Sequence, residues 1–346
     1  MKYFKWSIIF SIIALAFVTW YGFTGSGVEG ALNALYIALI LVILEVSLSF
    51  DNAVVNAGVL KHWDERWKLI FLTLGMLVAV FGMRMFFPIF IVSQTADMGL
   101  LEVWNMALNN PSEYASKLTA HHGEISAFGG VFLLLVFLNF MFDEEKEIHW
   151  IKRVESRLGL LGRLDVISIF VTLLALVLAV SFLAKEQEAS AILFAGVVGI
   201  LTYLGVHLLN EMLEHEGNES SSNVAEVVKK GSIAGFIYLE VLDASFSFDG
   251  VIGAFALTTD VVIIMVGLGI GALFVRSMTI YLVEKGTLGE YIYLEHGAHY
   301  AIGTLAIIML LSIKFHIPEI VTGGVGALFI IMSIYSSVKY NNQNPN

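Results

Sequence analysis

The sequence predicts an all-α fold: a polytopic membrane helix bundle of about ten spans with an inverted internal repeat. Of the 346 residues, 58% are hydrophobic and only 14% are charged, whereas soluble domains average about 25% charged residues. The hydrophobic residues gather in runs of the length that crosses about 30 Å of hydrocarbon. Because spanning segments must satisfy their own backbone and the alternating strands of a barrel are absent, these runs predict helices.

Ten apolar runs define the expected spans. Lys2 and Lys5 precede the first run as in a signal peptide, but no small-x-small cleavage site follows within Thr19–Gly27, so we expect an uncleaved anchor. Residues 94–124 are expected to form a long loop. The runs lie near 6–23, 31–60, 67–93, 125–142, 164–184, 189–211, 233–258, 260–284, 298–313 and 318–338.

Positive charges orient these spans. With both termini in the cytoplasm, fourteen of the 19 Lys and Arg residues fall in cytoplasmic segments, and only Lys117, Lys185 and Lys314 fall outside. Arg84 and Arg276 lie within spans. This asymmetry follows the positive-inside rule, and we expect an integral protein of the bacterial inner (cytoplasmic) membrane.

Two parts of the chain carry the same cues in the same order. Residues 45–52 read Glu-Val-Ser-Leu-Ser-Phe-Asp-Asn, and residues 243–250 read Asp-Ala-Ser-Phe-Ser-Phe-Asp-Gly. Each motif is followed by an arginine inside a span, Arg84 or Arg276, and then by a His-Gly pair. The motifs lie in the second and seventh expected spans, which cross in opposite directions. Inverted repeats of this kind build the midplane sites of many secondary transporters.

This duplication predicts the domain organisation. We expect an anchor helix, two repeats of opposite orientation, a connection between them and a short cytoplasmic tail. The corresponding ranges are 1–30 for the anchor, 31–184 for the first repeat, 185–232 for a linking span with a cytoplasmic loop, 233–338 for the second repeat and 339–346 for the tail.

The acidic motifs are the candidate site. A carboxylate at the bilayer centre costs about 2.5–3.5 kcal/mol, so matched acids there point to a bound cation. Carboxylate, amide and hydroxyl oxygens suit Mg²⁺, Ca²⁺ or Mn²⁺. We expect the acids to bind the ion, helped by Asn52 and the serines and supported by a further acid and the two arginines. The candidates are Glu45, Asp51, Asp243, Asp249 and Asn52, with Ser49, Ser247, Glu240, Arg84 and Arg276 in support.

Two alternatives to cation binding stay open for these acids. They either relay protons alone, or they only bind Arg84 and Arg276 to lock the fold. The arginines themselves act either as static partners or as moving counter-charges for an emptied site. On an unbroken helix Asp51 lies about 100° from the stripe that holds Glu45. Both acids of a motif therefore reach one site either through local unwinding, which Asn52 and Gly250 tolerate, or through a site shared between helices.

The pattern Glu-x-x-x-Ser-x-Asp-Asn followed by Asp-x-x-x-Ser-x-Asp resembles the TerC family of integral membrane proteins, over residues 41–90 and 238–280. That family is associated with tellurite resistance and includes manganese exporters. The resemblance implies that manganese is the favoured ion and that the metal-site positions are Glu45, Asp51, Asn52, Asp243 and Asp249. The chain departs from the family pattern at Gly250, in its extra N-terminal span and in its long loop 94–124.

Histidines form a weaker signal near the expected ends of two spans. They are candidates for vestibules that attract or release metal, and the alternative is that they are interfacial polar residues at helix starts. The residues are His122 and Glu124 at one face and Glu295, His296 and His299 at the other. Separately, residues 143–163 place Ile148, Ile151, Val154 and Leu158 at three- and four-residue steps between charged residues. This spacing predicts a helix on the cytoplasmic membrane surface or, alternatively, a docking helix.

Composition excludes several other functions. The chain has no cysteines and a net charge of −11, so it offers neither thiolate sites nor a basic surface for nucleic acid. No nucleotide-binding motif is present, and no nucleophile–base pair can be placed, so we do not expect an enzyme or a permanently bound cofactor. We expect an exporter whose partners are the lipid bilayer and a divalent cation as substrate. The alternatives are a non-transporting membrane scaffold and an exporter of amino-acid-like metabolites.

Overall fold

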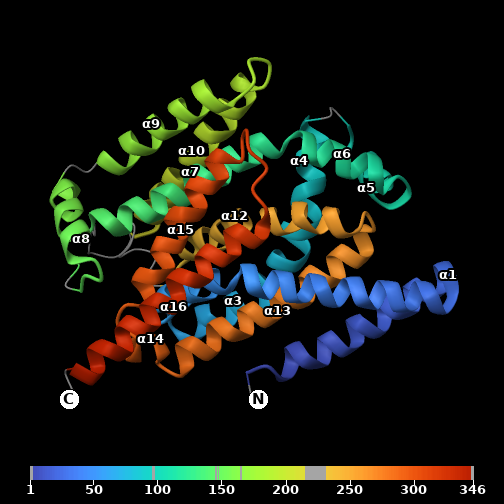
Figure 1. Ribbon diagram of the computed structural model, residues 1–346, viewed down its shortest axis with the longest axis horizontal. Coiled ribbons are helices and arrows are strands. Elements are labelled where there is room, and N and C mark those ends of the chain that lie inside the picture. Colours follow the sequence, from blue (N-terminus) through green and yellow to red (C-terminus); the bar gives the residue numbers. More distant parts are fainter. Residues whose placement is uncertain are drawn as a thin grey trace.

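The computed structural model describes residues 3–95, 98–144, 146, 148–163, 166–214 and 231–343 (Figure 1). These residues form helices and no strand, which confirms the all-α fold. The elements are α1 (Lys5–Leu48), α2 (Phe50–Leu60), α3 (Glu65–Leu77), the π-helical η1 (Val78–Phe86), α4 (Phe87–Thr95), α5 (Leu100–Asn109), α6 (Pro111–Ala120), α7 (His122–Phe142), α8 (Lys152–Gly159), the 3₁₀ helix η2 (Leu160–Arg163), α9 (Ile167–Leu183), α10 (Ala189–Glu214), α12 (Ile233–Leu257), α13 (Val261–Glu284), α14 (Thr287–Glu290), α15 (Leu294–Leu311) and α16 (Glu319–Gln343).

Helix α1 is a hairpin of two helical arms. Ser26 and Gly27 leave the helical conformation, and Gly27 has a φ of 64°, which glycine adopts without strain. Gly22 and Gly30 then face each other so closely that a Cβ on either one would meet the backbone carbonyl of the other. Figure 1 shows the two arms side by side, and α1 packs along α13. The first expected span therefore forms one arm of this hairpin, and the second expected span begins in the other arm.

Six helices in the described part of the chain are long and apolar enough to cross a membrane: α1, α7, α10, α13, α15 and α16. A seventh results if α8 and α9 together form one bent span. The expected runs also coincide with helices elsewhere, but α9 has only 17 residues, α12 contains three acids, and residues 67–93 are divided among α3, η1 and α4. An integral membrane protein is therefore supported, and ten crossings stay a prediction.

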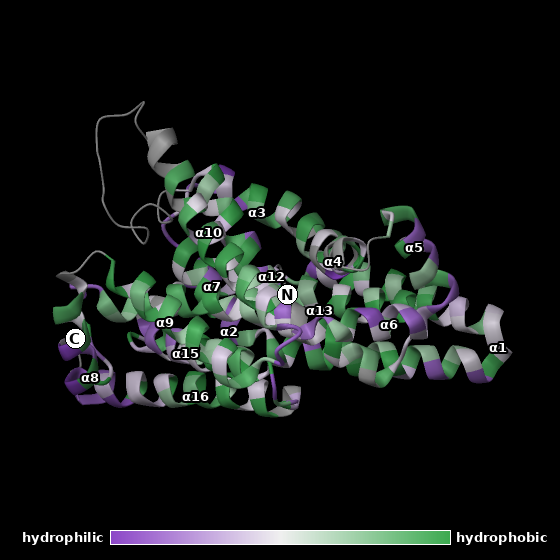
Figure 2. Ribbon diagram, turned by 90° about the horizontal axis from the view of Figure 1, so that it is seen from above, coloured by the Kyte–Doolittle hydropathy of each residue, from purple (hydrophilic) through white to green (hydrophobic). Residues whose placement is uncertain are grey.

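The core is built around α7. In the apolar stretch of α7 that is long enough to cross a membrane, 78% of the residues are buried. The helix packs against α10 and α15. Green, apolar ribbon dominates these helices in Figure 2. A second apolar cluster joins α1 and α13 to α5 and α6, so the expectation of a long loop over 94–124 is wrong. The helices α5 and α6 are short and amphipathic and bury Val103, Met106, Tyr114 and Leu118 against the bundle. Most of the expected cytoplasmic loop, residues 215–230, lies outside the described residues.

Candidate functional site

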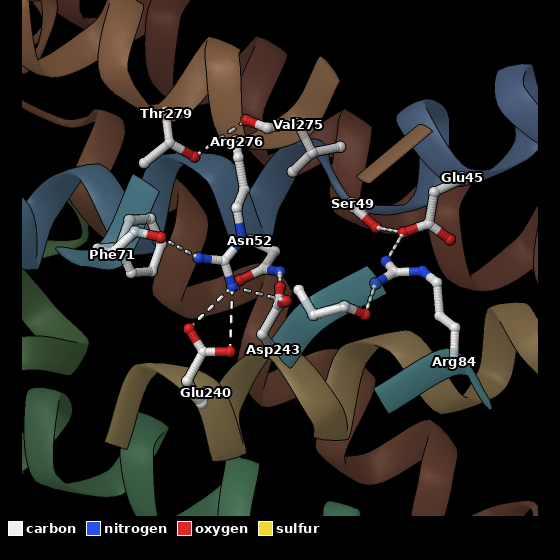
Figure 3. Close-up of polar contacts among 11 residues, drawn as sticks. Glu45, Ser49, Asn52, Phe71, Arg84, Glu240, Asp243, Val275, Arg276 and Thr279 are labelled. Atoms are coloured by element: carbon white, nitrogen blue, oxygen red, sulfur yellow. Dashed lines mark hydrogen bonds and ion pairs between the residues drawn. The ribbon is translucent and has the colours of Figure 1, made fainter. Parts of the chain in front are cut away.

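The two acidic motifs meet in the interior of the bundle. Helices α1 and α2 bring the first motif, α12 brings the second, and η1 and α13 each bring one arginine (Figure 3). The described charged groups are nearly inaccessible, with relative exposures between 1% for Glu45 and 7% for Asp51. At such burial, charged side chains require partners, because leaving one unpaired costs several kcal/mol.

The first arginine pairs with the first motif. Arg84 Nη2 donates a hydrogen bond to Glu45 Oε1, and Ser49 Oγ donates to the same oxygen at 3.0 Å. The other terminal nitrogen, Arg84 Nη1, donates to the carbonyl of Ala79 at 2.6 Å. Arg84 lies on the π-helical segment η1, a type of irregularity that is rare and frequent at functional sites.

The second arginine pairs with two acids of α12. Arg276 Nη2 lies 2.9 and 3.2 Å from the two carboxylate oxygens of Glu240 and 3.4 Å from Asp243 Oδ2. Arg276 Nη1 donates to the carbonyl of Phe71 at 2.8 Å, and its guanidinium lies 4.1 Å from the Phe71 ring centre. Arg276 therefore connects α13, α12 and α3.

Residues of the two motifs also contact each other directly. Asn52 Nδ2 donates a hydrogen bond to Asp243 Oδ1. Glu45 approaches Gly250 so closely that a Cβ at position 250 would lie 3.2 Å from Glu45 Oε2. The second motif thus has its glycine where the carboxylate of the first motif needs space.

Asp51 is the described acid of the first motif that binds neither arginine. It is buried, and its Oδ1 accepts the backbone N–H of Asn52 at 2.9 Å. Its other oxygen faces α16, where a Cβ on Gly326 would lie 3.2 Å from Asp51 Oδ2. The side chain of Asp249, the expected counterpart of Asp51, lies outside the described residues.

The backbone break differs from the expected one. In the first motif the chain leaves regular geometry at Ser49, with φ −102° and ψ 17°, three residues before Asn52. In the second motif α12 continues from Ile233 to Leu257 through Gly250, so the alternative of local unwinding does not hold there. Gly250 supplies room for Glu45 and not a change of backbone direction.

Several buried oxygens near the motifs have no hydrogen-bond partner within the described part of the chain. They are the hard donors Asn52 Oδ1, Asn56 Oδ1 and Ser247 Oγ. Among the described residues, no three Asp, Glu, His or Cys side chains converge as a ready metal cluster. Asn52 and Asp243, two of the expected metal ligands, are in direct contact, but Arg84 and Arg276 hold the expected ligands Glu45 and Asp243 and the supporting acid Glu240.

The histidine groups lie apart from this centre. At the start of α7, His121 Nδ1 pairs with Glu124 Oε1 at 2.9 Å, and His122 lies within 3.4 Å of Ser126 Oγ. Glu124 and His122 thus have partners within the same segment, as expected of interfacial polar residues at a helix start.

At the start of α15 the polar residues join neighbouring segments. Glu295 pairs with Lys61 at 2.9 Å, and His296 Nε2 lies 2.8 Å from the carbonyl of Ile148. His299 stacks on Phe140 with ring centres 3.7 Å apart. These contacts join the start of α15 to α2, to the end of α7 and to the segment before α8.

Sequence reasoning missed Phe71 and Gly75, both on α3. A Cβ on Gly75 would lie 2.5 Å from Arg276 Nη1 and from Glu240 Oε1, so only glycine lets α3 approach this ion pair. No sequence signal identified either residue, because an apolar span contains many phenylalanines and glycines, and only the packing distinguishes these two.

Residues 50–344 match the family described as "Protein of unknown function (DUF475)". The match covers most of the chain, including Asp51, both arginines and the whole second motif, so the chain belongs to this family. No curated protein and no solved structure matches the chain.

Proposed function

We propose that this member of the DUF475 family is a membrane transporter that exports a divalent metal cation through a carboxylate site at the middle of the bilayer. The observation that carries the proposal is the meeting of the two acidic motifs in one buried site, through the Asn52–Asp243 hydrogen bond and the contact of Glu45 with Gly250. The resemblance to the TerC family favours manganese as the ion.

The charges of the site support a divalent ion. When ionised, Glu45, Asp51, Glu240 and Asp243 carry four negative charges, and Arg84 and Arg276 balance two of them. One divalent cation would balance the remaining two, and it would satisfy buried oxygens that lack partners. Such hard oxygen ligands are those that Mn²⁺ and Mg²⁺ accept.

The directions of the chain support an inverted repeat. In Figure 3 Asn52 lies to the left of Glu45 in the first half, whereas on α12 Asp243 lies to the right of Glu240, which precedes it in the chain. We therefore assign ten spans in two repeats of opposite orientation, with both termini in the cytoplasm of a bacterial inner membrane. Alternating access then exposes one shared site to either side in turn.

The arginines take the part of counter-charges in this mechanism. When the ion leaves, Arg84 and Arg276 neutralise the carboxylates and give the paired arrangement described above. When the ion binds, at least one guanidinium must withdraw. Arg84 is the one expected to move, since the π-helical segment that carries it can shorten or shift by one residue of register.

The same ion pairs also favour a second function. A non-transporting membrane scaffold would use Arg84 and Arg276 as permanent locks between helices, and such a protein would not depend on Asp51, which binds neither arginine.

The decisive experiment is therefore made on Asp51. Purified protein is reconstituted in liposomes that contain a metal-sensitive dye, and uptake of Mn²⁺, Mg²⁺, Ca²⁺ and Zn²⁺ is compared with movement of labelled amino acids. Asp51→Asn is expected to abolish metal transport without loss of membrane insertion, because it breaks no ion pair. Glu186→Gln, at an exposed site, is the matched control and is expected to transport normally. Undiminished metal transport by Asp51→Asn would exclude the proposed site, and transport of amino acids alone would exclude the proposed substrate.

A further inference from the structure

Helix α8 lies across the bundle and not along it. The axis of residues 152–162 makes an angle of 105° with the axis of α9. Figure 1 places α8 at the same end of the molecule as the C-terminus, opposite the end that holds α5. In Figure 2 purple, hydrophilic residues gather at this end. A helix perpendicular to a neighbouring span has the orientation of one that lies in the plane of the membrane surface.

One residue fixes the inner face of α8. Glu155 is fully buried and accepts the backbone N–H of Ile151 at 3.0 Å. Its carboxylate also lies 3.4 Å from Lys146 Nζ and from His296 Nε2, and it accepts the hydroxyl of Tyr300 at 3.2 Å. Burial alone would raise the pKa of Glu155, but the hydrogen bonds from His296 and Ile151 and the nearby charge of Lys146 lower it to about 2. The carboxylate is therefore ionised, and it ties α8 to the first two turns of α15.

The outer face of α8 combines positive charge with apolar surface. Lys152, Arg153 and Arg157 are exposed. Arg153 and Arg157 are four residues apart and therefore lie on the same stripe of the helix. Val154 and Leu161 are exposed beside that stripe, at 44% and 41%. Basic residues adjoining exposed apolar side chains characterise helices that bind at the lipid interface.

The charge of this face opposes that of the whole chain. The protein carries a net charge of −11, so an anionic membrane surface repels it on average. Within 148–163 the only acidic residue is Glu155, which points inward. The outward charge of this segment is therefore positive, and it complements the phosphate groups of anionic lipids.

We propose that α8 is a binding site for anionic phospholipids of the cytoplasmic leaflet. Arg153 and Arg157 bind the headgroup phosphates, while Val154 and Leu161 enter the boundary between headgroups and acyl chains. Through Glu155, bound lipid holds the start of α15 in place. This inference depends on the protein being membrane-embedded and not on the proposed transport.

The test measures hydrogen exchange of residues 148–163 in full-length protein, in nanodiscs of phosphatidylcholine alone and in nanodiscs with equal parts of phosphatidylglycerol. The wild-type segment is expected to exchange more slowly in the anionic discs. Arg153→Gln/Arg157→Gln is expected to lose this protection. Titration of delipidated protein with phosphatidylglycerol, followed by native mass spectrometry, should show an affinity loss on the order of 5-fold for each charge removed.

The matched control is Lys185→Gln/Lys314→Gln, which removes two positive charges at the predicted opposite face. It is expected to keep both the protection and the affinity for phosphatidylglycerol. Equal exchange in the two kinds of disc would overturn the proposal, and so would protection that persists in the double arginine variant. Protection that requires an added soluble protein and not phosphatidylglycerol would overturn it as well, since α8 would then be a protein-docking helix.

Discussion

The two halves of the site hold matched residues on backbones of unequal regularity. In the first half the helix breaks at Ser49 and Arg84 lies on a π-helix. In the second half α12 and α13 are continuous where they carry Asp243 and Arg276. Because the two halves carry the same sequence cues, they differ in the regularity of their backbone hydrogen bonds and not in their motif residues. This difference indicates that the first half is the deformable partner and the second half the rigid one.

The arginines differ in the same sense. Arg84 binds one acid, Glu45, and a carbonyl of its own segment. Arg276 binds two acids and also reaches the carbonyl of Phe71, which belongs to the other half. Arg276 therefore connects the two halves, whereas Arg84 makes its hydrogen bonds within the first half.

The largest expected effect comes from removing the rigid half's arginine. Arg276→Met leaves Glu240 and Asp243 buried without their cation and should lower the free energy of unfolding by about 3–5 kcal/mol. Arg84→Met should lower it less, because Ser49 still donates to Glu45 and only one acid loses its partner. Thermal and denaturant unfolding in detergent would measure both. An equal or larger loss in Arg84→Met would contradict the proposed division of roles.

A smaller effect is expected from the ion itself. If Mn²⁺ binds the folded site, a hundredfold excess over its Kd should stabilise the protein by about 2.7 kcal/mol. The stabilisation should be absent in Asp51→Asn. Hydrogen exchange on adding Mn²⁺ should change in η1 and stay constant in α13, since only the first half is expected to rearrange. A change confined to α13 would reverse the assignment.

The smallest effect is expected from two glycines of the first half, of which only Gly75 contacts the ion pair between Arg276 and Glu240. Gly75→Ala introduces a Cβ 2.5 Å from Arg276 Nη1 and Glu240 Oε1, and overpacking of this kind should cost about 1–3 kcal/mol. In Gly82→Ala, within η1, the new Cβ meets Val78 Cγ1 at 3.4 Å, an ordinary contact. It should change stability by less than about 1 kcal/mol. The two variants are matched in chemistry, and similar melting temperatures for both would show that α3 does not press on the ion pair.

Sequence alone predicts most of the helices and the residues that form the site, but not the irregularities of the helix backbone. Hydropathy identifies the apolar runs because lipid selects for them. The order of cues suggests that the acids and the two arginines can pair, but which acid binds which arginine, Glu45 with Arg84 and Asp243 with Arg276, comes from the structure alone. The turn at Gly27 falls between the first two expected spans, but the break at Ser49 and the π-helix at Arg84 were not predicted. They depend on local hydrogen-bond patterns that leave no trace in hydropathy, and α5 and α6 were missed because they are too short and polar to read as spans.

The packing of α1 against α13 has a consequence for assembly during translation. Ser7 Oγ lies 2.6 Å from Ser277 Oγ and donates to the carbonyl of Leu273 at 3.2 Å, so polar groups of the early hairpin lie beside the turn that carries Arg276. Since α1 leaves the ribosome long before α13, we expect it to be in the membrane first and to offer α13 a packing surface during insertion. Residues upstream of the DUF475 match would then assist the insertion of the helix that carries Arg276.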